Sequence, residues 1–150
     1  MNKEIVLKQE KELQFQKFMY VDAWNLTEII INNVKSNYEK PVGVRIVYND
    51  VVVMHYLMDG KRDSDWLERK VKTVLESNHC SLYTFLTMDE NPIFEKWSSD
   101  EQYAICGGGF PIIEEGVVKG AICVSGLAHL DDHEVLINAL DSYLNKKMSI

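Results

Sequence analysis

The fold of this chain is decided by the stretch Gly107-Gly108-Gly109-Phe110-Pro111-Ile112-Ile113-Glu114-Glu115-Gly116-Val117-Val118-Lys119-Gly120-Ala121-Ile122-Cys123-Val124-Ser125-Gly126. It predicts two apolar β-strands that are joined by a tight turn at Glu115-Gly116, with glycines at both outer ends. Three consecutive glycines are not explained by strand formation, because each of them loses backbone entropy on folding. The backbone at Gly107–Gly109 therefore requires either a positive φ or the absence of side chains.

A second hairpin is predicted upstream. The runs Val42–Tyr48 and Val51–Met58 are rich in β-branched and aromatic residues, and Asn49-Asp50 between them tolerates the left-handed conformations of a two-residue turn. The segment Leu13–Phe18 alternates between apolar and polar residues, which predicts an edge strand. With two hairpins and this edge strand, the sheet is expected to hold about five strands.

Helices are expected on both sides of these strands. Apolar spacing predicts a short helix over residues 3–13, and capping and apolar patterns predict longer helices over 22–37, from Asp65 to about Asn78, and from Asp131 onward. Residues 80–102 carry no pattern that assigns one element. The sequence thus predicts an α+β fold in which an antiparallel sheet of about five strands is flanked by helices.

Length and charge narrow the class of protein. A chain of 150 residues is the size of a single domain, so we expect one domain over residues 1–150. The net charge of −7 argues against a nucleic-acid partner, which favours a basic face. No apolar run reaches the roughly 18 residues of a membrane span. The three cysteines, Cys80, Cys106 and Cys123, fit buried thiols in a reducing cytoplasm better than a disulfide framework.

The glycine-bracketed hairpin and the helix after Asp131 resemble the haem-degrading domain family, also called GlcG/HbpS-like. That family carries a Gly-Gly-x-Pro-Ile strand, a short turn and a Gly-Ala-Ile-x-Val-Ser-Gly strand, which correspond here to Gly108–Ile112 and Gly120–Gly126. The segment Trp66–Lys70 further resembles an uncharacterised bacterial and fungal branch of the family, over about residues 7–146. The resemblance implies a profilin-like fold, homo-oligomerisation and, in some members, binding of haem or related tetrapyrroles.

The glycine run also suggests a ligand site. Consecutive glycines can direct the amides of Gly107, Gly108 and Gly109 toward an anion, although they serve equally where a helix packs closely on a sheet. Arg69 and Lys70 supply cations for such an anion, unless they lie on a solvated helix face. With Phe110 as an apolar wall and Ser125 as a hydroxyl contact, these residues form the predicted pocket for a small anionic ligand.

Two histidines lie close to the end of the second hairpin. His129 and His133 are four residues apart, but a helix that begins at Asp131 leaves His129 in the preceding loop and removes a shared helical face. A third ligand is not evident, so a metal site is not expected. A loop histidine can still reach a pocket, and His129 is therefore the candidate axial ligand if the chain binds haem.

Two functional hypotheses follow. The first is a cytoplasmic, homo-oligomeric domain that binds a small anionic ligand, with haem or another tetrapyrrole as the candidate that the family resemblance implies. The alternative is a non-enzymatic homo-oligomeric scaffold or protein-interaction module, in which the glycines serve packing. No arrangement of nucleophile and base stands out, since Val-Ser-Gly-Leu-Ala around Ser125 lacks the Gly-x-Ser-x-Gly frame of a nucleophile elbow. Enzymatic activity is left open.

Overall fold

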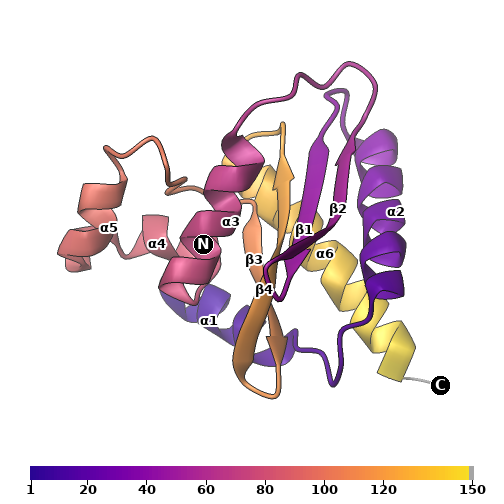
Figure 1. Cartoon of the computed structure of the whole chain (residues 1–150), viewed down its shortest axis with the longest axis horizontal. Coiled ribbons are helices and arrows are strands. Elements are labelled where there is room, and N and C mark those ends of the chain that lie inside the picture. Colours follow the sequence, from indigo (N-terminus) through magenta and orange to yellow (C-terminus); the bar gives the residue numbers. More distant parts are fainter. Residues whose placement is uncertain (149–150) are drawn as a thin grey trace.

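A four-stranded antiparallel sheet with the strand order β2-β1-β4-β3 forms the centre of the structure. The computed structural model describes residues 1–148. The elements are α1 (Lys3–Glu12), α2 (Tyr20–Asn37), β1 (Gly43–Tyr48), β2 (Val51–Leu57), α3 (Trp66–Ser77), α4 (Ser81–Leu86), the 3-10 helix η1 (Met88–Glu90), α5 (Pro92–Trp97), β3 (Gly109–Glu114), β4 (Val117–Ser125) and α6 (His129–Met148) (Figure 1). Within residues 1–148, no helix combines the length and apolar character that crossing a membrane requires.

Both predicted hairpins are confirmed. β1 pairs with β2, and β3 pairs with β4, each in antiparallel register. The turn residues Asn49 and Asp50 have φ of 49° and 63°, and Glu115 and Gly116 have φ of 49° and 81°. Two successive positive φ values give a turn whose twist matches that of the flanking strands. The β1–β4 pairing then joins the two hairpins into one sheet.

The predicted fifth strand is wrong. Leu13–Phe18 connects α1 to α2, and its pairing with β3 is confined to one bridge between Phe15 and Glu114. The Phe15 amide donates to the Ile113 carbonyl over 2.8 Å, but the Phe18 amide donates to the Glu114 side chain over 2.6 Å. The Phe18 amide is thus bound by a side chain and not by the backbone of β3. Leu13, Phe15 and Phe18 are all buried, so the segment is a connection that is anchored in the core.

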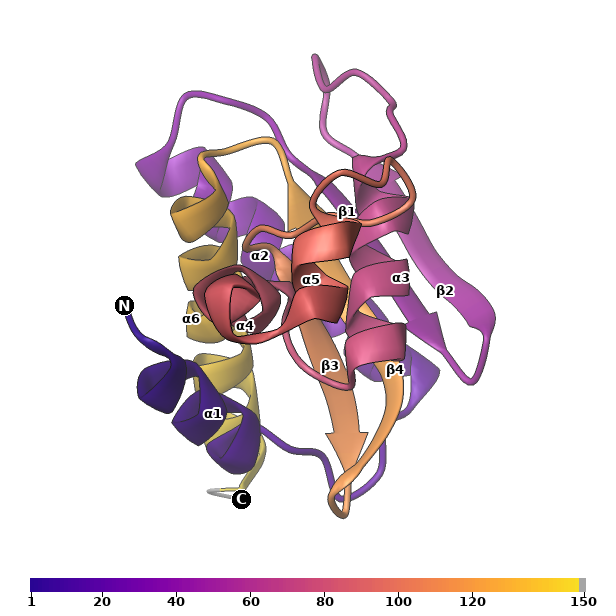
Figure 2. The same ribbon diagram turned by 90° about the vertical axis from the view of Figure 1, so that its left-hand side faces the viewer.

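Helices cover both faces of the sheet, as the sequence predicts. α2 and α6 lie on one face and α3 lies on the other, with the sheet between them (Figures 1 and 2). β4 shows the alternation clearly, since Ile122 and Val124 pack into the larger core, whereas Ala121 and Cys123 pack in a smaller cluster with α3. The central strands are therefore buried on both faces.

Residues 80–102 form the short elements α4, η1 and α5, which the sequence left unassigned. Figure 2 shows α4 and α5 in front of the β3 edge of the sheet, beside α3. α4 is fixed there by Ser81, whose buried hydroxyl oxygen accepts a 2.9 Å hydrogen bond from the Gly109 amide. This contact holds the start of β3 against α4.

Candidate functional site

The glycine run lies where β3 begins, between α3 and the start of α6. Gly108 has a φ of 120°, a conformation that residues with a side chain rarely adopt. A Cβ atom at Gly108 would lie 2.5 Å from the Val124 carbonyl oxygen, and one at Gly107 would lie 2.3 Å from the His129 carbonyl oxygen. Both requirements that the sequence raised, a positive φ and the absence of side chains, are therefore met at this run.

The backbone of the run bonds within the chain. The Gly107 amide donates to Nδ1 of His129 over 3.0 Å, and the Gly109 amide donates to Ser81 over 2.9 Å. The Gly108 carbonyl accepts the Val124 amide over 2.7 Å. Because all three glycines are buried and two of their amides are engaged, the geometry supports close packing, which was the alternative to an anion site.

Lys70 is buried in an ion pair. Its ammonium donates to the Val124 carbonyl over 2.8 Å and lies 3.2 Å from Oδ2 of Asp132, with both side chains at most 3% exposed. Oδ1 of Asp132 accepts the Leu127 amide, which ties the start of α6 to the end of β4. Burial raises the pKa of Asp132 to about 6, although the charge of Lys70 acts in the opposite direction. Lys70 thus holds α3, β4 and α6 together and faces no open surface.

Arg69 is placed differently from its neighbour. Its Nε–H donates to the Tyr103 carbonyl over 2.9 Å, and the centre of its guanidinium lies 3.8 Å from the centre of the Trp66 ring. The residue is half-buried, so part of its side chain reaches the surface of the molecule. Of the two cations in the predicted pocket, Arg69 is the one that a ligand can approach.

Two further residues of the predicted pocket are enclosed. Phe110 has no exposed surface and belongs to the core formed with α2 and α6. Ser125 is also buried, opposite Gly43 in the β1–β4 ladder. The structure therefore brings Lys70, Gly108 and the end of β4 together, but as an interior contact and not as the wall of a cavity.

The predicted start of the last helix is corrected by two residues. α6 begins at His129, because the Asp132 amide already donates to the Ala128 carbonyl. His129 and His133 consequently lie one turn apart on the same helix. His133 is completely buried with Nε2 2.8 Å from Oε1 of Gln9, and burial lowers its pKa to about 4. Over residues 1–148, no group of three His, Cys, Asp or Glu side chains could hold a metal ion.

His129 itself is half-buried at the surface beside α4. Its ring centre lies 4.9 Å from that of Phe85, with the two rings edge to face. Burial and the charge of Lys70 lower its pKa, so the imidazole is neutral near pH 7. Since Nδ1 accepts the Gly107 amide, the proton of the neutral ring lies on Nε2.

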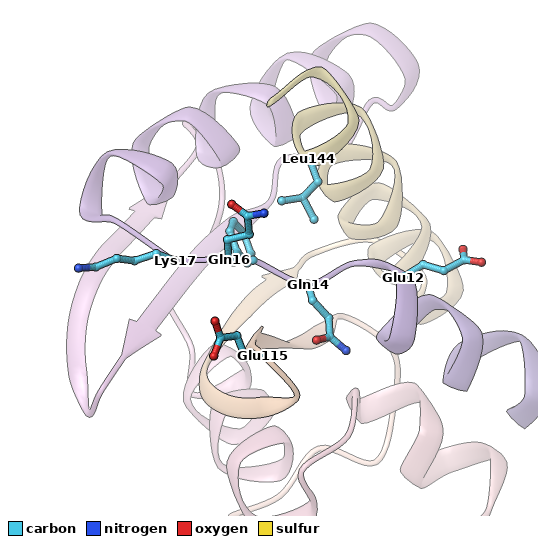
Figure 3. A pocket seen from close by; sticks show the side chains of 7 residues that line it. Glu12, Gln14, Gln16, Lys17, Glu115 and Leu144 are labelled. Atoms are coloured by element: carbon cyan, nitrogen blue, oxygen red, sulfur yellow. The ribbon is translucent and has the colours of Figure 1, made fainter. Parts of the chain in front are cut away.

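A surface concavity lies at the end of β3 opposite the glycine run. Its volume is about 780 Å³, and it is lined by Glu12, Gln14, Phe15, Gln16, Lys17, Glu115 and Leu144. The side-chain oxygen of Gln14 accepts a hydrogen bond from the Gly116 amide, and this contact closes one side of the concavity. Figure 3 shows the side chains of Glu12 and Lys17 pointing away from each other. A ligand site has polar groups that converge, so we assign no ligand to this concavity.

Comparison with known proteins places the chain in a family. The sequence profile of the family described as "Haem degrading protein HbpS-like" matches residues 18–141. A UPF0303 protein of Schizosaccharomyces pombe is 31% identical over 150 residues, which cover 95% of this chain and 84% of that protein.

Solved structures share the fold of this chain. The crystal structure of the Ybr137w protein superposes with a TM-score of 0.87 and 28% identity, covering 99% of this chain and 90% of that one. The crystal structure of a PduOC:heme complex superposes with a TM-score of 0.71 and 17% identity, covering 83% of this chain and 93% of that one, and so shares the fold. The resemblance seen in the sequence is confirmed, and the chain belongs to the HbpS-like haem-degrading protein family.

Proposed function

We propose that this protein is a cytoplasmic, homo-oligomeric domain of profilin-like fold that binds haem or a related tetrapyrrole. The observation that carries the proposal is the family match, which spans residues 18–141 and whose description names haem. The fold shared with a PduOC:heme complex supports it. Haem bears two carboxylates, so it also fits the small anionic ligand that the sequence suggested.

Arg69 and His129 are the groups of the predicted site that can meet these carboxylates. The guanidinium of Arg69 offers a planar set of N–H donors that matches a carboxylate. Nε2 of His129 carries a proton, because Nδ1 accepts the Gly107 amide, so this nitrogen donates a hydrogen bond and has no lone pair for iron. Phe85, 43% exposed and in contact with the His129 ring, supplies apolar surface for a macrocycle.

A haemin titration followed by visible absorption tests the proposal. The unaltered protein should give a saturable, shifted Soret band. Arg69→Ala should weaken binding about 5–150-fold, the range of a lost charged hydrogen bond of roughly 1–3 kcal/mol. Arg62→Ala, at an exposed loop position, is the matched control and should bind like the unaltered protein. A weak change that never saturates in the unaltered protein would rule out specific haem binding.

A second candidate function, self-association, is favoured by an exposed apolar surface. Trp24, Ile31, Met54 and Tyr56 line a groove of about 260 Å³ between α2 and β2, which we call the α2–β2 surface. Trp24 is 61% exposed and Tyr56 is 47% exposed. Contiguous apolar groups of this kind mark interaction sites.

We propose that a second copy of this chain covers the α2–β2 surface. β2 is an edge strand of the sheet, and an exposed edge is a ready partner for another strand. Glu28 and Lys35, both exposed, also line the groove. A twofold axis that sets two α2 helices antiparallel brings Glu28 toward Lys35 of the partner subunit, so the surface is complementary to itself in charge.

A further inference from the structure

The four histidines of the chain differ in which ring nitrogen is free to ligate a metal. A ligating nitrogen needs its lone pair, and in a neutral imidazole the hydrogen bond at the other nitrogen decides where the proton lies. All four histidines fall within the described residues, so their hydrogen bonds can be compared directly.

Three of the four are unsuited to ligation. Nδ1 of His129 accepts the Gly107 amide, and Nδ1 of His55 lies 3.1 Å from Nη1 of Arg45. Amides and guanidinium groups only donate, so both rings carry their proton on Nε2, the nitrogen left for a ligand. His133 is fully buried and offers no open face.

His79 shows the opposite arrangement. Its Nδ1 lies 2.8 Å from Oε1 of Glu10, an oxygen that only accepts, so Nδ1 carries the proton and Nε2 of the neutral ring keeps its lone pair. The Glu10 side chain is 9% exposed, and its Oε2 accepts the Cys80 amide over 2.8 Å. The carboxylate is therefore held in place by the backbone next to the histidine that it orients.

The ring is also held by stacking, yet it remains accessible. The His79 and Tyr83 ring centres lie 4.0 Å apart with an interplanar angle of 23°, and the His79 side chain is 31% exposed. Histidines that ligate metals commonly donate their other ring N–H to a carboxylate, which fixes the tautomer and raises the basicity of the ligand. The Glu10–His79 pair has this form and is positioned before any ligand arrives.

We propose that Nε2 of His79 is the axial ligand of the haem iron, with Glu10 as its positioning residue; this inference rests on the proposed haem binding. A bare metal ion is not the occupant, because residues 1–148 contain no cluster of three metal-binding side chains. A porphyrin supplies four nitrogen ligands of its own, so one imidazole from the protein is sufficient.

Absorption and electron paramagnetic resonance spectra of the haemin-loaded protein test the assignment. His79→Gly should lose the spectrum of an imidazole-ligated ferric haem and bind haemin at least tenfold more weakly, and added imidazole should restore that spectrum. Glu10→Gln should weaken binding about 10–100-fold, as the loss of an outer partner does. His55→Gly is the matched control on an exposed strand and should leave both measurements unchanged.

The outcomes separate the two proposals. If the unaltered protein binds haemin saturably but His79→Gly gives the same spectrum and affinity, the ligand is another residue and this inference fails while haem binding stands. If His129→Gly alone alters the spectrum or the affinity, this inference also fails, and His129 is the ligand. If the unaltered protein gives no saturable band, the proposed function fails first. Circular dichroism of each variant confirms that it is folded, and rescue by imidazole excludes a general loss of structure as the cause.

Discussion

The ammonium of Lys70 lies 3.2 Å from the carboxylate of Asp132, and both side chains are almost completely buried. The pair joins α3 to the first turn of α6 across the end of β4, because the same ammonium donates to the Val124 carbonyl. Taking two charges out of water is costly, so forming such a pair adds little net stability. Removing one partner is nevertheless strongly destabilising, because the other charge then stays buried without a counter-charge.

Lys70→Met should therefore destabilise the fold strongly. Removing one partner leaves the other charge buried and uncompensated, with an expected loss of about 3–5 kcal/mol in the free energy of unfolding at pH 7. Urea unfolding measures the loss. Lys72→Met is the matched control on the same helix, since its pair with Glu76 is exposed and should contribute less than about 1 kcal/mol. Equal effects of the two substitutions would contradict the structural role of Lys70.

Asp132 should raise the free energy of unfolding as the pH falls, whereas a carboxylate with a lowered pKa has the opposite effect. Its pKa of about 6 in the folded state exceeds the ordinary value of about 3.9. Between these values the folded protein holds a proton that the unfolded chain releases, so this group favours folding below pH 4 and loses that contribution as the pH rises through 6. Relative to Asp132→Asn, the unaltered protein should gain about 2 kcal/mol from pH 7 to pH 4. A constant difference across this range would show that Lys70 keeps the carboxylate ionised.

His133 should have the opposite effect on the free energy of unfolding, over an overlapping pH range. Burial lowers its pKa to about 4, so between pH 6.5 and pH 4 the unfolded chain takes up a proton that the folded protein excludes. This group's contribution is present above pH 6.5 and is lost as the pH falls, by about 3 kcal/mol. His133→Gln should abolish that loss, measured as the free energy of unfolding at several pH values. An unchanged acid sensitivity in this variant would place the titrating group elsewhere.

The two opposing effects lie on adjacent residues. The acid stabilisation from Asp132 and the acid destabilisation from His133 offset each other in the unaltered protein, so its own pH profile should be flatter than that of either variant. The comparison of the two single variants is therefore the informative one.

Gly108→Ala should be among the most destabilising single-methyl changes in the chain. The added Cβ would lie 2.5 Å from both Nζ of Lys70 and the Val124 carbonyl oxygen, at a φ of 120°. We expect a loss of about 3 kcal/mol or more, since the change adds a clash with backbone to the cost of the strained φ. Gly116→Ala, at a φ of 81° with nothing within 4 Å, carries the strain without the clash and should cost only about 1 kcal/mol. Thermal unfolding compares them, and equal shifts in Tm would contradict the packing argument.

The sequence predicted those parts of the fold that local chemistry determines. The Asn49-Asp50 and Glu115-Gly116 turns could be placed because few residues adopt two successive positive φ values, and the flanking strands follow from their apolar runs. Leu13–Phe18 could not be placed correctly by the same reasoning. Its alternation is that of a strand, but its Phe18 amide bonds to the side chain of Glu114, 96 residues away, a contact that no local pattern reveals.

The candidate site was less predictable because its partners are far apart along the chain. Lys70 has the pattern of an exposed helix residue beside Arg69, and its burial depends on Asp132, 62 residues away. His79 follows a helix without any motif, and Glu10, the residue that sets its tautomer, lies 69 residues away. No spacing rule links such pairs, so the distinction between Arg69 as accessible and Lys70 as buried required the three-dimensional structure.

Self-association through the α2–β2 surface is expected to depend on Trp24. Trp24→Glu places a charge in the proposed apolar contact and should lower the mass measured by light scattering to that of a monomer. Ile93→Glu alters a similarly exposed apolar residue on α5 and should leave the mass unchanged. Lys35→Glu should weaken association by setting two acids against each other, and Glu28→Lys in the same chain should restore it. Assembly that survives Trp24→Glu, or a failure of the double variant to recover, would place the contact on another face.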